Sequence, residues 1–108
     1  MSTIEEQFEQ VLIEDCNTCT RTLKYNPTRT RELIGRLGGV GAVKNLMARY
    51  PDPNGYSDGF EKLCLAGRLD LSLEAKMLKS EFQSLFTPEE LELARKRLAV
   101  YDYFPALE

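Results

Sequence analysis

Histidine is absent from this chain of 108 residues. It is the side chain whose ordinary pKa lies closest to neutrality, and it is the usual base that activates a serine or cysteine nucleophile. Its absence excludes Ser–His and Cys–His catalysis, so that only carboxylate pairs remain as acid–base groups. Asp70 and Glu74, four residues apart with Arg68 nearby, form one such pair. We expect them to fix a connector through an ion pair with Arg68, and we predict that the protein is not an enzyme.

Cysteine is scarce, and its spacing does not describe a metal site. The three thiols are Cys16 and Cys19, which form a CxxC pair, and Cys64. A structural zinc site takes four ligands, and the chain offers neither a second pair nor histidine. A redox CxxC lies at a helix N-terminus, whereas this one lies late in an expected helix. We therefore expect Cys19 and Cys64 to be small buried residues flanked by Cys16, with no metal and no cofactor.

Long hydrophobic runs are also absent. No apolar segment approaches the ~20 residues that a membrane-spanning helix needs, and the first ten residues, MSTIEEQFEQ, are acidic, without the basic and apolar regions of a secretory signal. An odd number of cysteines indicates reduced thiols. These features predict a cytoplasmic location and no membrane partner.

The charges of the chain are segregated, although their sum is only −3. Residues 1–20 carry five acids and no base, whereas residues 21–50 carry seven bases and the single acid Glu32. A basic segment between acidic ends is typical of a nucleic-acid footprint. The same segment could instead be neutralised by the acidic N-terminal helix. The sequence leaves both interpretations open.

The pattern of apolar residues predicts an all-α fold, a compact single-domain bundle of five to seven short helices. Capping residues mark the expected starts: Ser2 or Thr3 before the first helix, Asn26-Pro27 before the second, Ser57, Ser72 or Asp70, and Thr87-Pro88 before the last. Gly38-Gly39 and Gly67 mark ends, and PDPNG, residues 51–55, marks a loop. The threonine-rich stretch 16–22 predicts that the first helix ends early or bends. No segment alternates with the period of two that strands require.

Several motifs from Tyr25 to Leu98 resemble a widespread bacterial helical domain with no established activity. The matching pieces are Tyr25-Asn26-Pro27, Leu37-Gly38-Gly39-Val40, Gly59-Phe60, Gly67 to Ser72, and Leu85-Phe86-Thr87 leading into Glu90-Leu91. The chain departs from that pattern near Cys64 and after Leu98. The resemblance implies a helical fold and no catalytic or binding residue. We divide the chain into an N-terminal helix (1–24), a core helical domain (25–98) and an aromatic tail (99–108).

Two helices joined by a glycine turn, residues 28–37 and 40–50, resemble a helix-turn-helix. The expected nucleic-acid contacts are Arg29, Arg31, Arg36, Lys44 and Arg49. The start of the second helix, however, offers Val40, Gly41 and Ala42 where base-reading polar side chains are usual. Accessory nucleic-acid binding is therefore the alternative function.

The final helix is apolar on two faces, which points to the leading function. One face holds Leu91, Ala94, Leu98 and Tyr101, and a second strip holds Leu93, Val100, Phe104 and Leu107. A second apolar face either lies in the core or meets a partner. We predict a non-enzymatic protein-interaction module that uses this strip to bind another protein or a second copy of itself.

Overall fold

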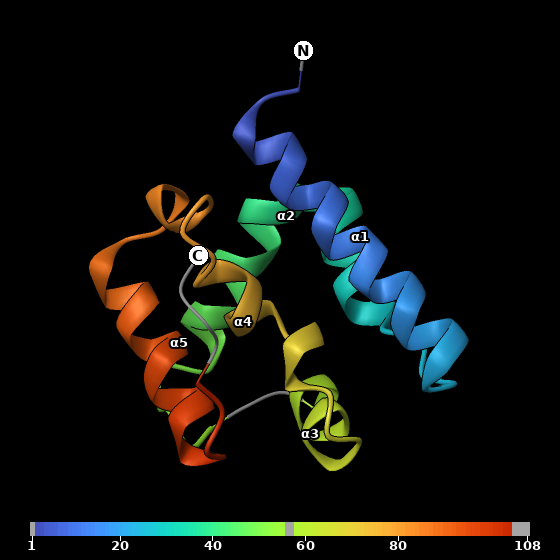
Figure 1. Cartoon of the computed structure of the whole chain (residues 1–108). Helices are drawn as coiled ribbons and strands as arrows, with labels where there is room; N and C mark the ends of the chain where they lie inside the picture. The colour runs from blue at the N-terminus through green and yellow to red at the C-terminus, as the bar shows by residue number, and fades with distance from the viewer. Residues whose placement is uncertain (1, 56–57, 105–108) are drawn as a thin grey trace.

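The computed structural model describes residues 2–55 and 58–104 and shows a compact all-α bundle, as predicted (Figure 1). Within these residues the elements are five α-helices and two short 3₁₀ helices. They are α1 (Ile4–Thr22), α2 (Thr28–Arg49), α3 (Asp58–Leu65), the 3₁₀ helix Leu69–Leu71, α4 (Leu73–Met77), the 3₁₀ helix Gln83–Leu85 and α5 (Pro88–Val100). None of the described residues forms a strand. No described helix is long and apolar enough to cross a membrane.

The starts of α1, α4 and α5 follow local capping chemistry, as the sequence indicates. The predicted Asn26 cap of α2 was wrong, because Pro27 is the N-cap residue and no side chain caps this helix. Thr3 caps α1 and Thr87 caps α5, each in a complete capping box with the glutamate three residues later. Ser72 caps α4, since its hydroxyl accepts a hydrogen bond from the Ala75 N–H at 3.1 Å. The predicted Ser57 cap lies outside the described residues.

Of the two predicted outcomes for the first helix, an early end or a bend, the early end was wrong, because α1 continues to Thr22. The Thr18 and Thr20 hydroxyls donate to the carbonyl oxygens four residues back, so their polar groups are satisfied within the helix. Cys16 and Cys19 lie on the buried face of this stretch, and Cys16 is a core residue rather than a flank. Burial of this face therefore outweighs the low helix propensity of threonine.

The helix α2 consists of two straight parts that meet at Gly38, as the predicted pair of helices requires. Gly38 has φ 78° and ψ 169°, a conformation that is accessible to glycine but strained for other residues. Its neighbour Gly39 lies against the backbone of α1 and donates its N–H to Glu9 Oε1 at 2.9 Å. The bend lets the first part of α2 pack along α1 while the second part continues towards α5 (Figure 1).

The hydrophobic core joins all five helices. Phe8 of α1 is fully buried, and its ring meets those of Phe82 and Phe86 edge-on, at centroid distances of 5.1 and 5.2 Å. The segment between α4 and α5 thus closes one end of the bundle. At the other end, α3 ends at Leu65, and Gly67 (φ 70°) turns the chain so that the Arg68 N–H donates to the Leu63 carbonyl.

Candidate functional site: a pocket among the helices

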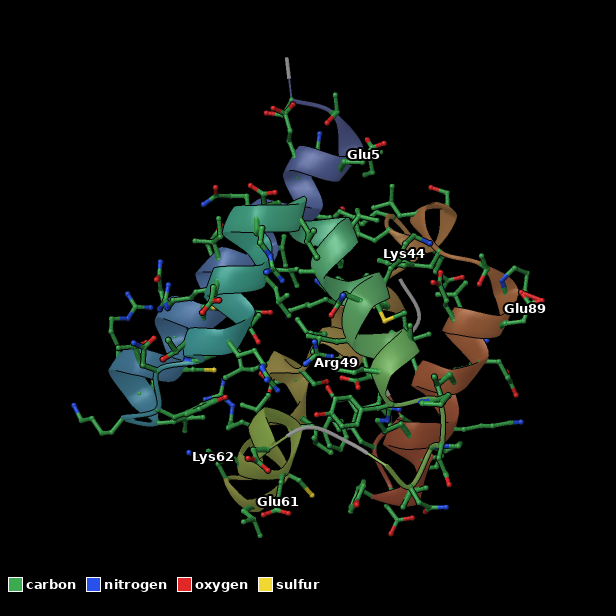
Figure 2. The ribbon with its side chains drawn as sticks, turned by 180° about the vertical axis from the view of Figure 1, so that it is seen from behind. Glu5, Lys44, Arg49, Glu61, Lys62 and Glu89 are labelled. Atoms are coloured by element: carbon green, nitrogen blue, oxygen red, sulfur yellow. The ribbon has the colours of Figure 1, made fainter. Side chains whose placement is uncertain are left out.

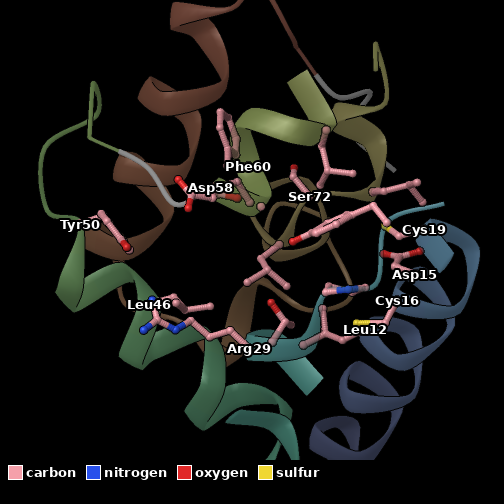
Figure 3. Close-up of a pocket in the computed structure, with 18 of the residues that line it drawn as sticks. Leu12, Asp15, Cys16, Cys19, Arg29, Leu46, Tyr50, Asp58, Phe60 and Ser72 are labelled. Atoms are coloured by element: carbon pink, nitrogen blue, oxygen red, sulfur yellow. The ribbon is translucent and has the colours of Figure 1, made fainter. Parts of the chain in front are cut away.

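A pocket of about 480 Å³ opens among the helices (Figure 3). Four residues of α1 form one wall, and both parts of α2 together with α3 and the Leu71–Glu74 segment form the others. Arg97 of α5 also lines the pocket, and the other lining residues that matter below are Leu12, Asp15, Cys16, Cys19, Arg29, Leu46, Asp58, Phe60 and Ser72. Pockets that bind small organic molecules usually measure ~300–1,000 Å³ and combine apolar walls with a few polar groups. This pocket has both properties.

The spacing along α1 places its pocket residues on one face. Leu12, Asp15, Cys16 and Cys19 follow one another at three, one and three residues, and side chains three or four apart share a face of a helix. Figure 3 shows the Asp15 carboxylate beside the two cysteines on this wall. An acidic side chain therefore lies within a mainly apolar surface.

Asp15 is a buried carboxylate with incomplete compensation. Its side chain is 16% exposed, and Lys76 of α4 places its Nζ 3.5 Å from Oδ2. Lys76 therefore acts on the carboxyl through its charge and a long hydrogen bond. Burial is the largest influence on this carboxyl, and it raises the pKa from 3.8 to about 6 despite the opposing effect of Lys76. Asp15 is thus a buried acid on the pocket wall whose charge is only partly compensated by Lys76.

The CxxC thiols line the same wall, where burial disfavours their thiolate forms. Burial raises the pKa of Cys16 to about 11 and also raises the pKa of Cys19, so that both are neutral thiols near pH 7. The thiolate is the form that attacks electrophiles and binds metals. In the part of the chain that the structure describes, no group of three or more metal-ligating side chains comes together.

A buried ion pair forms another part of the pocket wall. Arg97 of α5 is 2% exposed, and its NH1 lies 2.9 Å from Oε2 of Glu74 in α4. The same guanidinium donates to the carbonyl oxygens of Tyr50 and Asp52, at the end of α2 and in the loop after it. Arg97 therefore connects three elements that are distant in sequence. Of the two partners that the sequence offered Arg68, the structure selects Asp70 (3.0 Å), because Glu74 is engaged by Arg97.

The five basic residues predicted to contact nucleic acid do not form one equivalent set. Lys44 pairs with Glu90 of α5 at 2.8 Å, and Figure 2 shows it facing the start of that helix. Arg31 donates to Asn17, Thr20 and Asn26. The remaining three, Arg29, Arg36 and Arg49, are exposed, and none makes an ion pair with a described residue. Nucleic-acid contact stays a prediction for these three arginines.

The alternative to nucleic-acid binding was that the acidic first helix neutralises the basic segment of residues 21–50. The two segments meet through hydrogen bonds with uncharged partners, such as Glu9 with the Gly39 N–H and Arg31 with Thr20. No ion pair joins a described acid of residues 1–20 to a described base of residues 21–50, and Asp15 pairs with Lys76 instead. The charge segregation of the sequence is therefore retained in the fold.

The predicted apolar strip on α5 is partly exposed. Leu93 is half-buried against the core, whereas Val100 is 47% and Phe104 74% exposed. A hollow of about 420 Å³ lies beside Phe104 and is lined also by Leu78, Ala99 and Tyr103 and by the charged residues Glu92, Arg95 and Lys96. Leu107 lies outside the described residues. The helix α5 continues across the predicted boundary at residue 98 to Val100, and the Tyr101 ring packs near Phe60. The division into segments 1–24, 25–98 and 99–108 stays a prediction.

Neither Asp15 of the pocket wall nor Arg97 of the buried ion pair was singled out from the sequence, although the sequence holds a signal for both. Asp15 falls three residues after Leu12, and Arg97 falls three after Ala94, so each charge lies within the apolar arc of its helix. A charged side chain within the apolar arc of a helix either lies at the edge of that arc in contact with water or is buried. Only its neighbours in space decide between these two states.

Comparisons with known proteins add no assignment: no family model matches the chain, and neither a curated protein nor a solved structure matches it significantly.

Proposed function

We propose that this chain is a non-enzymatic helical binding module whose central pocket holds a small, largely apolar organic molecule. The observation that carries the proposal is the pocket of about 480 Å³, which lies among otherwise buried core residues such as Leu12, Met47 and Phe60. Close packing is the rule in protein interiors, so space of this size is typical of a ligand site. The neutral thiols on its wall support binding in preference to chemistry.

Filling the pocket is expected to abolish binding while the fold persists. The probe is 2-naphthalenemethanol, and binding is followed by NMR chemical-shift changes of the Leu12, Leu46 and Leu63 methyl groups. We expect saturable binding to the natural chain and at least ~tenfold weaker binding to Cys16→Leu, equivalent to about 1.4 kcal/mol. The larger side chain enters space that the ligand would occupy.

The matched control is Cys64→Leu, the same substitution at a half-buried cysteine that does not line the pocket. Far-UV circular dichroism checks that both variants remain helical. Unchanged affinity in Cys16→Leu, or the absence of saturable binding to the natural chain, would refute the proposal.

A second function, self-association, is supported by the exposed face at the C-terminal end of α5. The Phe104 ring and the apolar hollow beside it lie on the same face. A two-fold interface brings the same patch of two copies together, so a projecting ring and an adjacent hollow can complement each other. We propose a second copy of this chain as the partner of the strip formed by Val100 and Phe104.

Phe104→Ser is expected to shift a dimer to a monomer in sedimentation velocity, because it removes the most exposed described aromatic ring of the strip. Leu65→Ser is the control, since Leu65 is 81% exposed on α3, away from the strip. That variant should sediment like the natural chain. A natural chain that is monomeric at all concentrations up to ~1 mM, the Kd range of marginal association, would remove the self-association proposal.

A further inference from the structure

We propose that the central pocket selects an organic ammonium ion, an apolar body that carries a protonated amine, and that Asp15 is the residue that recognises it. This inference rests on the proposed function, because it assigns a ligand class to the same pocket. A ligand of this kind matches both features of the site, apolar walls and one acidic group that accepts hydrogen bonds.

The geometry of Asp15 is the first support. Its side chain lines the pocket and is 16% exposed, and its buried Oδ2 atom is the one that Lys76 approaches. Lys76 approaches only to 3.5 Å, a distance that gives Coulomb attraction without a well-formed hydrogen bond. Buried carboxylates are usually paired and hydrogen-bonded, so one long contact compensates the charge of Asp15 only in part. An ammonium group in the pocket would bring a second positive charge and three hydrogen-bond donors to this side chain.

The other charged groups of the pocket do not provide an equivalent site. Glu74 is also buried, but its Oε2 atom is occupied by Arg97 at 2.9 Å. Asp58 is exposed, so that water already solvates its carboxylate. A carboxylate ligand is disfavoured deep in the pocket, since it would face Asp15 across apolar walls. Arg29, the exposed cation among the lining residues, belongs to the start of α2 and is available to solvent.

Protonation of Asp15 should control this recognition. The groups that act on its carboxyl are Lys76 of α4, which favours the charged form, and Asp70 of the 3₁₀ helix and Glu14 of α1, which disfavour it. Burial exceeds these effects and places the pKa at about 6. At pH 7 the group is largely ionised and can pair with a cation. At pH 5 it is largely protonated, so that its attraction for an ammonium ion is lost.

A matched series of ligands tests the inference. The probes are 2-naphthalenemethylamine, 2-naphthalenemethanol and 2-naphthoic acid, which share one apolar body and differ in the charge of the head group. We expect the amine to bind about tenfold or more tightly than the alcohol at pH 7, as a hydrogen bond to a charged group implies. The acid should bind most weakly. The preference for the amine should disappear between pH 7 and pH 5, while the affinity for the alcohol stays constant.

Two variants separate Asp15 from the rest of the pocket. In Asp15→Asn the amine and the alcohol should bind with equal affinity, because the charge is removed and the shape is kept. Asp58→Asn, which removes the exposed acid that also lines the pocket, should retain the preference. If all three probes bind equally to the natural chain, the pocket binds ligands but the inference about ammonium ions fails. If none of them binds, the proposed function itself fails.

Discussion

Replacing Arg97 by leucine is expected to lower the free energy of unfolding by about 3–5 kcal/mol, the usual cost of leaving one partner of a buried ion pair uncompensated. The substitution leaves the Glu74 carboxylate buried, with a side chain only 9% exposed. It also removes the donor for the Tyr50 and Asp52 carbonyls, which hold the end of α2 beside α5. Urea unfolding followed by circular dichroism at pH 7 measures the change.

Arg95→Leu is the matched control on the same helix. Arg95 is 48% exposed and pairs with Glu92 three residues away at 3.4 Å, so its loss should change the free energy of unfolding by less than about 0.5 kcal/mol. The double variant Glu74→Leu/Arg97→Leu should be more stable than Arg97→Leu alone, because it leaves no unpaired charge. A loss below about 1 kcal/mol for Arg97→Leu, well short of the range for a broken buried pair, would contradict the role assigned to Arg97.

Gly39→Ala is expected to destabilise the protein by about 1–3 kcal/mol, the range for overpacking a close contact. A Cβ atom at this position would lie 2.7 Å from the Cα and 2.9 Å from the Cβ of Glu9, so that α1 and α2 would have to separate. Their separation would also stretch the hydrogen bond from the Gly39 N–H to Glu9 Oε1. Thermal and urea unfolding both report this change.

Gly35→Ala should have the opposite effect, which makes it a sharp control. Gly35 is exposed within the first part of α2, and a Cβ there would meet nothing within 4 Å. Alanine is favoured over glycine inside a helix, so stability should rise by about 0.5–1 kcal/mol. Equal effects of the two substitutions would mean that helix propensity, and not the close approach of α1, governs Gly39.

The capping signals predicted the starts of α1, α4 and α5 because they act within a few residues. A threonine hydroxyl reaches the N–H three residues ahead whatever the rest of the chain does, as Thr87 and Glu90 show at the start of α5. The threonine-rich end of α1 was mispredicted for the complementary reason. The low helix propensity of the threonines there is outweighed by the burial of Cys16 and Cys19. Their burial depends on which elements pack against this part of α1.

The candidate site was beyond the reach of sequence patterns. The CxxC spacing argued against a metal or redox site, but it did not predict that Cys16 and Cys19 line a pocket beside Asp15. Local spacing likewise linked Glu74 to Arg68, although its partner Arg97 lies 23 residues away. Pairing of charges across a core depends on the crossing of α4 and α5, which no local pattern encodes.

The sequence by itself determined the all-α class, the glycine break in α2 and the starts of α1 and α5, because hydrogen bonds within single turns settle these features. The tertiary structure alone decided which charges are buried and which remain in water. Asp15 and Arg97 are costly to bury, and the packing of distant helices assigns each its environment. The free energy of a charge depends on its surroundings in space, so the position of the pocket and its acidic group followed from the fold.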